Sequence, residues 1–252
     1  ARSSSTAARS PSASPKPNSM EQLAASAAAW GIVLSPQQIA QFAAYAAELR
    51  RWNERVNLTT ITEDSAIATR HFLDSLRCAL SWGDAPANLI DIGAGAGFPG
   101  LPLKILQPAL QLTLVESIGK KAAFLEHIVA LLGLGDVEVL AERAEVVGHA
   151  AAHRERYDVT VARAVAELRV LAEYCLPLCR TGGRFLAPKG AQLDAELAAA
   201  QPTIARLGGS VIGVEPVQIP GAEPRVLVVV GKVAATPARY PRAPGIPAKR
   251  PI

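Results

Sequence analysis

The sequence of 252 residues has few cysteines and histidines and no long hydrophobic run. Its three cysteines are odd in number, and the pair Cys175 and Cys179 has no histidine or further cysteine nearby at metal-ligand spacing. A disulfide framework and a bound metal are therefore not expected. No apolar stretch reaches the roughly 18–20 residues that a membrane-spanning helix requires. These absences predict a soluble, cytoplasmic protein whose cysteines, including Cys78, are buried free thiols.

Acidic residues are absent from both ends of the chain. Residues 1–20 carry three basic side chains and residues 236–252 carry four, so residues 21–235 contribute a net −3 to the formal charge of +4. The body of the chain is therefore not a general nucleic-acid-binding surface. We expect any RNA contact to come from local patches and from the C-terminal tail, 236–252, whose basic residues are Arg239, Arg242, Lys249 and Arg250.

Large apolar side chains are absent from residues 1–19, which are rich in Ser, Ala and Pro. Such a segment cannot bury enough surface to offset the entropy of ordering, so we expect it to be disordered. Arg and Ser without acids also suit an organellar transit peptide, which is the alternative. The only methionine of the chain, Met20, stands where an amphipathic pattern begins.

A helical pattern extends from residue 20 to about residue 82. Ser35, Pro36 and Gln38 are typical of a helix start with a capping box, and apolar residues then recur at helical spacing. Three arginines lie off the apolar stripe, where they form either a solvated face or an RNA contact: Arg50, Arg51 and Arg55. A further helical stretch contains Arg70 and Asp74, which are four residues apart; the spacing favours a pair on the helix surface, and a functional role for Arg70, His71 and Asp74 is the alternative.

The most informative stretch is Asn88 to Gly100, a short apolar run that ends at Gly93 and is followed by three more glycines. This order is typical of a buried parallel strand, a tight turn and a helix that begins at Pro99. Glycine allows positive φ and lets the backbone pass close to a ligand. The stretch therefore predicts a nucleotide-type site at the end of a strand.

Two cofactor classes use such a turn. The spacing Gly95-x-Gly97-x-x-Gly100 fits the dinucleotide fingerprint, with Glu116 near the place of a ribose-binding acid. The same turn also fits the S-adenosylmethionine loop, in which an acid, here Asp91, stands two residues before the first glycine. That acid favours S-adenosylmethionine, because a dinucleotide site has no need of a carboxylate inside its first strand.

Strands and helices alternate after the glycine turn. Apolar runs at 110–115, 137–140, 157–162 and 184–187 are separated by helical patterns, and two final runs, 210–214 and 226–230, resemble a hairpin. This alternation predicts a doubly wound α/β domain over residues 83–235. With the helical N-terminal extension, 20–82, it indicates the class I (Rossmann-like) methyltransferase fold, with a mostly parallel seven-stranded sheet.

Several blocks in one order give the sequence a family resemblance from about Leu23 to Pro251. It resembles the bacterial 16S rRNA guanine-N7 methyltransferase G family, also called the glucose-inhibited division protein B family. The blocks are Trp52-Asn53…Asn57-Leu58-Thr59, Arg70-His71-x-Leu73-Asp74-Ser75, the Asp91 to Gly100 loop, Gly119-Lys120-Lys121, Arg143-Ala144-Glu145, Ala162-Arg163-Ala164, Lys189-Gly190 and the tail from Tyr240 to Lys249. This order of blocks is more specific than the glycine turn alone.

The resemblance implies S-adenosylmethionine as cofactor and assigns contacts to it. Gly93 and Phe98 match loop positions that touch the cofactor, and Glu116 matches the acid that accepts the ribose hydroxyls. Ala144 and Glu145 match the adenine-side segment. We expect the cofactor to be bound by Gly93, Phe98, Ala144, Glu145, Arg163, Glu116, Asp91, Gly95 and Gly97, all of them on or near the carboxyl ends of strands.

The implied reaction is methylation of N7 of one guanine in 16S rRNA, with naked rRNA or the small ribosomal subunit as partner. Guanine N7 has a lone pair and no proton, so positioning supplies most of the catalysis. No residue is assigned a chemical step; Arg163, Arg70 and His71 are candidates for positioning. Phe98, Phe72 and Tyr240 are candidates to stack the target base. The expected RNA-binding residues are Arg50, Arg51, Arg55, Lys120, Lys121, Lys189, Arg239, Arg242, Lys249 and Arg250.

Two other functions remain open from the sequence. One is a class I methyltransferase that acts on a small molecule or a protein, with the helical segment as a lid. The other is a non-enzymatic or dinucleotide-binding module that uses the same loop. No heptad pattern or large unexplained apolar face is evident, so a monomer is expected.

Overall fold

The computed structural model describes residues 18–163 and 166–252. Residues 1–19, expected to be disordered, lie outside the described residues apart from the last two. Asn18 accepts hydrogen bonds from the main-chain N–H groups of Met20 and Glu21, and Glu21 bonds back to the N–H of Asn18. This capping box begins helix α1, Ser19–Ala28, one residue before the expected boundary.

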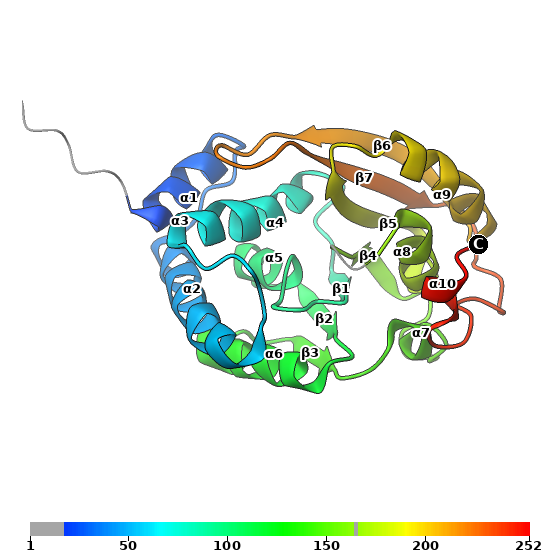
Figure 1. Cartoon of the computed structure of the whole chain (residues 1–252), viewed down its shortest axis with the longest axis horizontal. Helices are drawn as coiled ribbons and strands as arrows, with labels where there is room; N and C mark the ends of the chain where they lie inside the picture. Colours follow the sequence, from blue (N-terminus) through cyan, green and yellow to red (C-terminus); the bar gives the residue numbers. More distant parts are fainter. Residues whose placement is uncertain (1–17, 164–165) are drawn as a thin grey trace, which may run out of the picture.

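A seven-stranded sheet forms the centre of the molecule, in the order β3-β2-β1-β4-β5-β7-β6 (Figure 1). Strands β1 to β5 are parallel, whereas β7 is antiparallel to both of its neighbours. The strands are β1 Asn88–Ile92, β2 Gln111–Val115, β3 Val137–Leu140, β4 Tyr157–Val161, β5 Cys179–Gly190, β6 Gly209–Val217 and β7 Arg225–Lys232. The predicted mostly parallel sheet of class I methyltransferases is confirmed.

The carboxyl ends of β1, β2 and β4 meet at one edge of the sheet. Asp91 in β1 pairs with Leu114 in β2 and with Val161 in β4, so the three strands end level with one another. The strands are nearly continuous apolar runs because helices cover both of their faces. The loops that follow these three strands therefore lie together, where ligands of such sheets bind.

Helices cover both faces of the sheet (Figure 1). One apolar cluster joins Phe42 and Phe72 of the N-terminal segment to Phe124, and the other contains Leu171 and Phe185. The first face carries α5 Gly100–Leu106 and α6 Gly119–Leu132. The second carries α7 Ala144–Val147, α8 Leu168–Cys175, α9 Asp194–Arg206 and α10 Ile246–Lys249.

The N-terminal helical segment packs on the first face. The predicted helix start is confirmed: Ser35 and Gln38 form a capping box at the start of α2, Pro36–Val56. Short elements then return the chain toward the sheet: α3 Asp64–Ala66, the π-helical η1 Ile67–Leu73, α4 Asp74–Leu76 and the 3-10 helix η2 Arg77–Leu80. This return brings η1 and α4 to the edge where the parallel strands end.

Some boundaries differ from the sequence expectation. Helix α5 begins at Gly100, with Pro99 as its N-cap. Strand β5 covers Cys179–Gly190 instead of only 184–187, because Cys179 pairs with Tyr157 of β4 and Arg184 to Gly190 pair with β7. Pairing with a neighbour extends a strand beyond the residues that an apolar run identifies.

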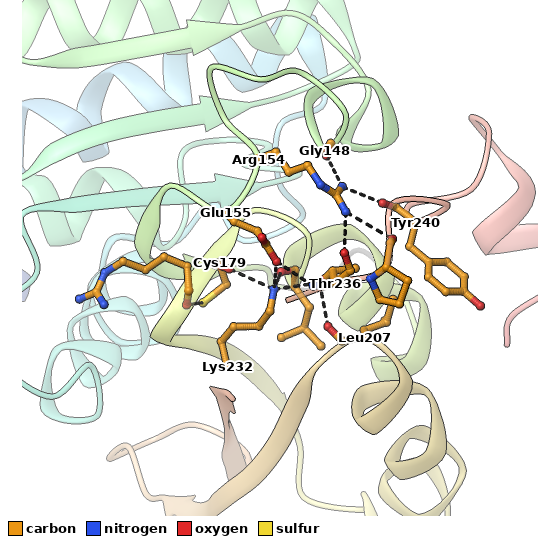
Figure 2. Close-up of polar contacts among 11 residues, drawn as sticks. Gly148, Arg154, Glu155, Cys179, Leu207, Lys232, Thr236 and Tyr240 are labelled. Carbon is orange, nitrogen blue, oxygen red and sulfur yellow. Dashed lines mark hydrogen bonds and ion pairs between the residues drawn. The ribbon is translucent and has the colours of Figure 1, made fainter. Parts of the chain in front are cut away.

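The C-terminal tail is folded onto the domain through a buried network (Figure 2). The buried Lys232 ammonium donates to Glu155 at 3.0 Å, to Thr236 Oγ1 at 2.8 Å and to the Cys179 carbonyl at 3.1 Å. Arg154 donates to the main-chain carbonyls of Thr236 and Tyr240, at 2.9 and 2.8 Å. The chain is thus anchored where the predicted basic tail begins.

Arg242 anchors the middle of the tail. Its guanidinium makes a two-pronged ion pair with Glu173, with the shortest N–O distance at 2.7 Å, and also donates to the Arg250 carbonyl at 2.8 Å. Glu173 is fully buried in α8. The phosphate contact expected for Arg242 does not fit this arrangement, because its guanidinium neutralises a buried carboxylate.

We expect Arg242→Met to lower the free energy of unfolding by about 3 kcal/mol, because it leaves the buried charge of Glu173 unpaired. Arg239→Met is the matched control: Arg239 is exposed and its guanidinium lies 5.1 Å from the centroid of the Tyr240 ring, so a loss below about 1 kcal/mol is expected. Urea unfolding of the two variants checks this. Equal losses would contradict the anchoring role.

Candidate functional site

Two carboxylates hold the loop between β1 and α5. Asp91 Oδ2 accepts the N–H of Gly100 at 2.8 Å, and Glu116 Oε2 accepts the N–H of Gly95 at 3.0 Å. The φ angles are positive at Gly93, Gly95 and Gly97, at 69°, 59° and 93°. The loop therefore needs glycine for its backbone conformation and strand-end carboxylates for its position.

Gly95 and Gly97 have different roles in the loop. A Cβ added at Gly95 would meet no atom closer than 3.8 Å, and Gly95 lines a cavity. A Cβ at Gly97 would collide with Leu101 at 2.4 Å and with the Tyr45 hydroxyl at 2.5 Å. Gly95 is thus a place of close approach for a ligand, whereas Gly97, expected to bind the cofactor, is required for packing.

A cleft of two adjoining cavities lies at the carboxyl ends of the parallel strands. The larger, of about 400 Å³, is lined by Leu58, Thr59, His71, Gly93 to Ala96, Phe98, Glu116 to Ile118, Lys121 and Arg163. The smaller, of about 160 Å³, is lined by Ile92, Gly93, Val115, Ser117, Glu142 to Glu145 and Tyr174. Gly93 and Ser117 line both cavities, so one elongated ligand can extend across the strand ends.

Glu116 lines the larger cavity, next to Ser117, which lines both. It is buried, and its two oxygens accept the N–H groups of Gly95 and Ile118, at 3.0 and 2.8 Å. Each carboxylate oxygen can accept a second hydrogen bond. Glu116 is therefore fixed in place and retains one acceptor site per oxygen, which suits the two hydroxyls of a ribose.

Ala144 and Glu145 form one wall of the smaller cavity. The Glu145 side chain is buried and accepts the N–H of Gly245 in the C-terminal tail at 2.7 Å. Its carboxylate is thus committed to holding the tail against α7. The main chain and the Ala144 side chain remain to face a ligand, as expected for a segment that reads an adenine edge through backbone groups.

Arg163, directly after β4, joins the sheet to the N-terminal segment. Its guanidinium donates to Asp74 Oδ2 at 2.8 Å and to His71 Nδ1 and the Arg70 carbonyl, both at 3.3 Å. Asp74 also lies 3.7 Å from Arg225. The expected Arg70–Asp74 pair is wrong: Asp74 is buried and turned to arginines of the sheet, while Arg70 is exposed.

His71 lies in the larger cavity as a neutral ring. Burial, followed by the charges of Arg163 and Arg225, lowers the pKa of His71 to about 3. The ring stacks on Phe98, with centroids 4.4 Å apart, and its Nε2 lies 2.8 Å from Thr59 Oγ1. Thr59 was not among the residues that the sequence singled out individually; only its place in the Asn57-Leu58-Thr59 block signalled it.

The three aromatic candidates for base stacking are all buried. Phe98 lines the cavity, but its ring packs between His71 and Tyr45, whose centroid is 5.3 Å away. Phe72 and Tyr240 are buried in the two apolar clusters. None of these rings offers an open face to a base.

The predicted RNA-binding cations differ in their exposure and in their ion-pair partners. Lys189 pairs with Glu196 at 2.6 Å and donates to the Ala166 carbonyl, and Arg242 pairs with Glu173, so both have structural partners. Arg50 and Arg51 are exposed; Arg50 pairs with the partly exposed Asp64 and Arg51 with the largely buried Glu48. Exposed side chains are those of Arg55, Lys120, Arg239, Lys249 and Arg250, and Lys121 is half-buried at the cavity.

The residues of the cleft fit S-adenosylmethionine. Gly95 leaves room where a Cβ would enter the cavity, and Glu116 keeps acceptors for the ribose. Gly93, Ala144 and Arg163 also line the cleft. Together with the strand order, this cleft defines a class I S-adenosylmethionine-dependent methyltransferase.

Comparisons with known proteins identify the family. The family model of rRNA small subunit methyltransferase G matches residues 38–221. The ribosomal RNA small subunit methyltransferase G of Roseiflexus castenholzii is 69% identical over 92% of this chain and 100% of its own length. That of Chloroflexus aggregans is 61% identical over 89% of this chain and 94% of its own. The chain belongs to the rRNA small subunit methyltransferase G family.

A solved structure agrees with this fold. M. jannaschii TYW2 in complex with AdoMet superimposes with a TM-score of 0.50 and 15% sequence identity, over 62% of this chain and 72% of that chain. At this identity the likeness concerns the fold alone. In the part of the chain that the structure describes, no helix is long and apolar enough to cross a membrane, and no group of three or more His, Cys, Asp or Glu residues could hold a metal ion.

We expect Gly95→Val to abolish measurable S-adenosylmethionine binding, because the branched side chain would enter the cavity. Gly133→Val is the matched control, since Gly133 has a similar φ of 62° and open space around it, at the end of α6 and away from the cleft. Calorimetric titration should find normal affinity for the control. Unchanged affinity in Gly95→Val would contradict the loop assignment.

Asp91 is a buried acid with an unusual titration. Burial raises its pKa to about 7, against the opposing bond from Gly100 and the charge of Arg163, and its Oδ1 has no hydrogen-bond partner among the described residues. Between about pH 3.8 and pH 7, Asp91 is therefore protonated in the folded protein and ionised in the unfolded chain, so folding takes up a proton. The contribution of Asp91 to stability accordingly falls as the pH rises through that window.

Asp91→Asn should remove this dependence while its amide oxygen keeps the bond to Gly100. We expect the variant to gain stability relative to the wild type between about pH 4.5 and pH 8, by on the order of 3 kcal/mol. Urea unfolding of both proteins without cofactor at several pH values measures the difference. A difference that stays constant would show that Asp91 ionises normally.

Proposed function

We propose that this protein transfers a methyl group from S-adenosylmethionine to N7 of one guanine in 16S rRNA. Membership in the rRNA small subunit methyltransferase G family supports an acceptor in the small-subunit rRNA. The chemistry of the larger cavity supports N7, because this atom needs no base to remove a proton before it attacks.

The main support for this proposal is that none of the described residues lining the larger cavity is free to act as a general base toward the acceptor. The titratable residues that line the described part of the larger cavity are His71, Glu116, Lys121 and Arg163. His71 is neutral, and both of its ring nitrogens are engaged, with Arg163 and Thr59. Glu116 is turned toward two loop N–H groups. This arrangement suits an acceptor atom that carries a lone pair and no proton.

The bound cofactor supplies an electrophilic methyl group on a sulfonium. The protein positions the reactants, which alone lowers the barrier substantially. Arg163 is held by the carboxylate of Asp74 at 2.8 Å. The carboxylate partly neutralises the charge of Arg163, which limits its repulsion of the purine as methylation makes the purine positive. The guanidinium is held in place and lines the cavity.

RNA is the proposed partner, as naked 16S rRNA or as the small subunit. The exposed cations Arg55, Lys120, Arg239, Lys249 and Arg250 are suited to phosphate contacts, which position RNA without reading its sequence. We propose that the protein acts in the cytoplasm as a monomer. Arg242 and Lys189 contribute indirectly, by holding the tail and the loop after β4.

The test is transfer of labelled methyl groups to 16S rRNA, offered as naked RNA and as small subunits. We expect one labelled guanine, located by the chain cleavage that N7-methylguanine permits. Gly95→Val is the inactive control and Gly133→Val the active one. Absence of label in both substrate forms, with cofactor binding intact, would refute the rRNA acceptor and favour a small molecule or a protein.

A further inference from the structure

Thr59 is a hydrogen-bonding side chain on the wall of the larger cavity, outside the cofactor loop, and it is held by several bonds. Its hydroxyl oxygen lies 3.0 Å from the N–H of Ile61 and 2.8 Å from His71 Nε2. Its main-chain N–H donates to Asn53 Oδ1 at 2.8 Å. Side chain and backbone are thus both fixed, although Thr59 lies in a loop.

The direction of the Thr59–His71 bond follows from the surroundings of the ring. Arg163, which has only donors, points Nη2 at His71 Nδ1 at 3.3 Å; with Arg163 as the donor, Nδ1 carries a lone pair, and the nearby Arg70 carbonyl accepts from Arg163 instead of from the ring. A neutral imidazole with an unprotonated Nδ1 carries its proton on Nε2, and the pKa of about 3 keeps the ring neutral. His71 Nε2–H therefore donates to Thr59 Oγ1.

Both lone pairs of the Thr59 hydroxyl are then occupied, one by His71 and one by Ile61. Its O–H proton has no acceptor among the described residues. The hydroxyl can therefore act toward a molecule in the cavity only as a donor. Lys121 is another donor on this wall, but it stands on a long flexible stem and has no comparable support.

We infer that Thr59 selects guanine by donating a hydrogen bond to O6 of the target base, an inference that rests on the proposed function. O6 and N7 are adjacent acceptors on the same edge of guanine, whereas adenine presents an amino group beside N7. A donor on O6 leaves N7 free and fixes its direction. The amino group of adenine would meet a hydroxyl with no lone pair to offer, and this mismatch rejects it.

The experiment compares guanine with 2,6-diaminopurine at the modified position of small-subunit rRNA. This analogue keeps N7 and the 2-amino group and replaces O6 by an amino group. For Thr59→Val we expect kcat/KM to fall about tenfold on guanine and to stay nearly unchanged on the analogue. Thr59→Ser keeps the hydroxyl and should retain the discrimination of the wild type.

The outcomes separate the inference from the proposed function. Equal losses on both bases in Thr59→Val would overturn the inference, because a structural role affects both alike. Failure of the wild type to methylate guanine would overturn the proposed function, and this inference with it. Nitrogen-15 spectra of the labelled histidines give a second readout: we expect the Nε2–H tautomer at His71, and the Nδ1–H tautomer would overturn the inference because Thr59 would then have to donate to Nε2.

Discussion

The site depends on carboxylates that bind main-chain N–H groups at the ends of adjacent parallel strands. Asp91 holds Gly100, where α5 begins, and Glu116 holds Gly95 and its own loop at Ile118. Without these bonds, a loop with three glycines at positive φ would have no preferred shape. This arrangement requires Asp91 to be buried, and burial raises its pKa.

The N-terminal segment completes the active cleft. His71 in η1 and Asp74 in α4 reach Arg163, and Thr59 comes from the loop after α2. One side of the cavity is thus built by the N-terminal helical segment, whereas the other is built by loops that follow strands of the sheet. This division explains how a widespread fold acquires a particular acceptor.

The C-terminal tail shows that a basic composition does not reveal the role of each cation. Lys232 and Arg242 satisfy buried acceptors, and Glu145 in the cofactor wall holds the tail through Gly245. The tail therefore supports the wall of the smaller cavity. Its remaining exposed cations are free to meet a polyanion.

The sequence by itself determined the fold class, the capping box at Ser35, the glycine loop and the place of the acid Glu116 at the end of β2. These features are local: hydrophobic period, turn residues and motif spacing are set by neighbours along the chain. The block order likewise sufficed for the family. The boundary at residue 19 and the length of β5 were less exact, because capping geometry and strand pairing decide them.

Only the tertiary structure decided which partner each polar side chain takes. The helical spacing of Arg70 and Asp74 indicated a pair, yet Asp74 binds Arg163, 89 residues away in the sequence. The same holds for Arg242 with Glu173 and for Thr59 with His71. Long side chains choose among all groups that folding brings near, and burial favours the partner that neutralises a charge, which spacing along the chain does not encode.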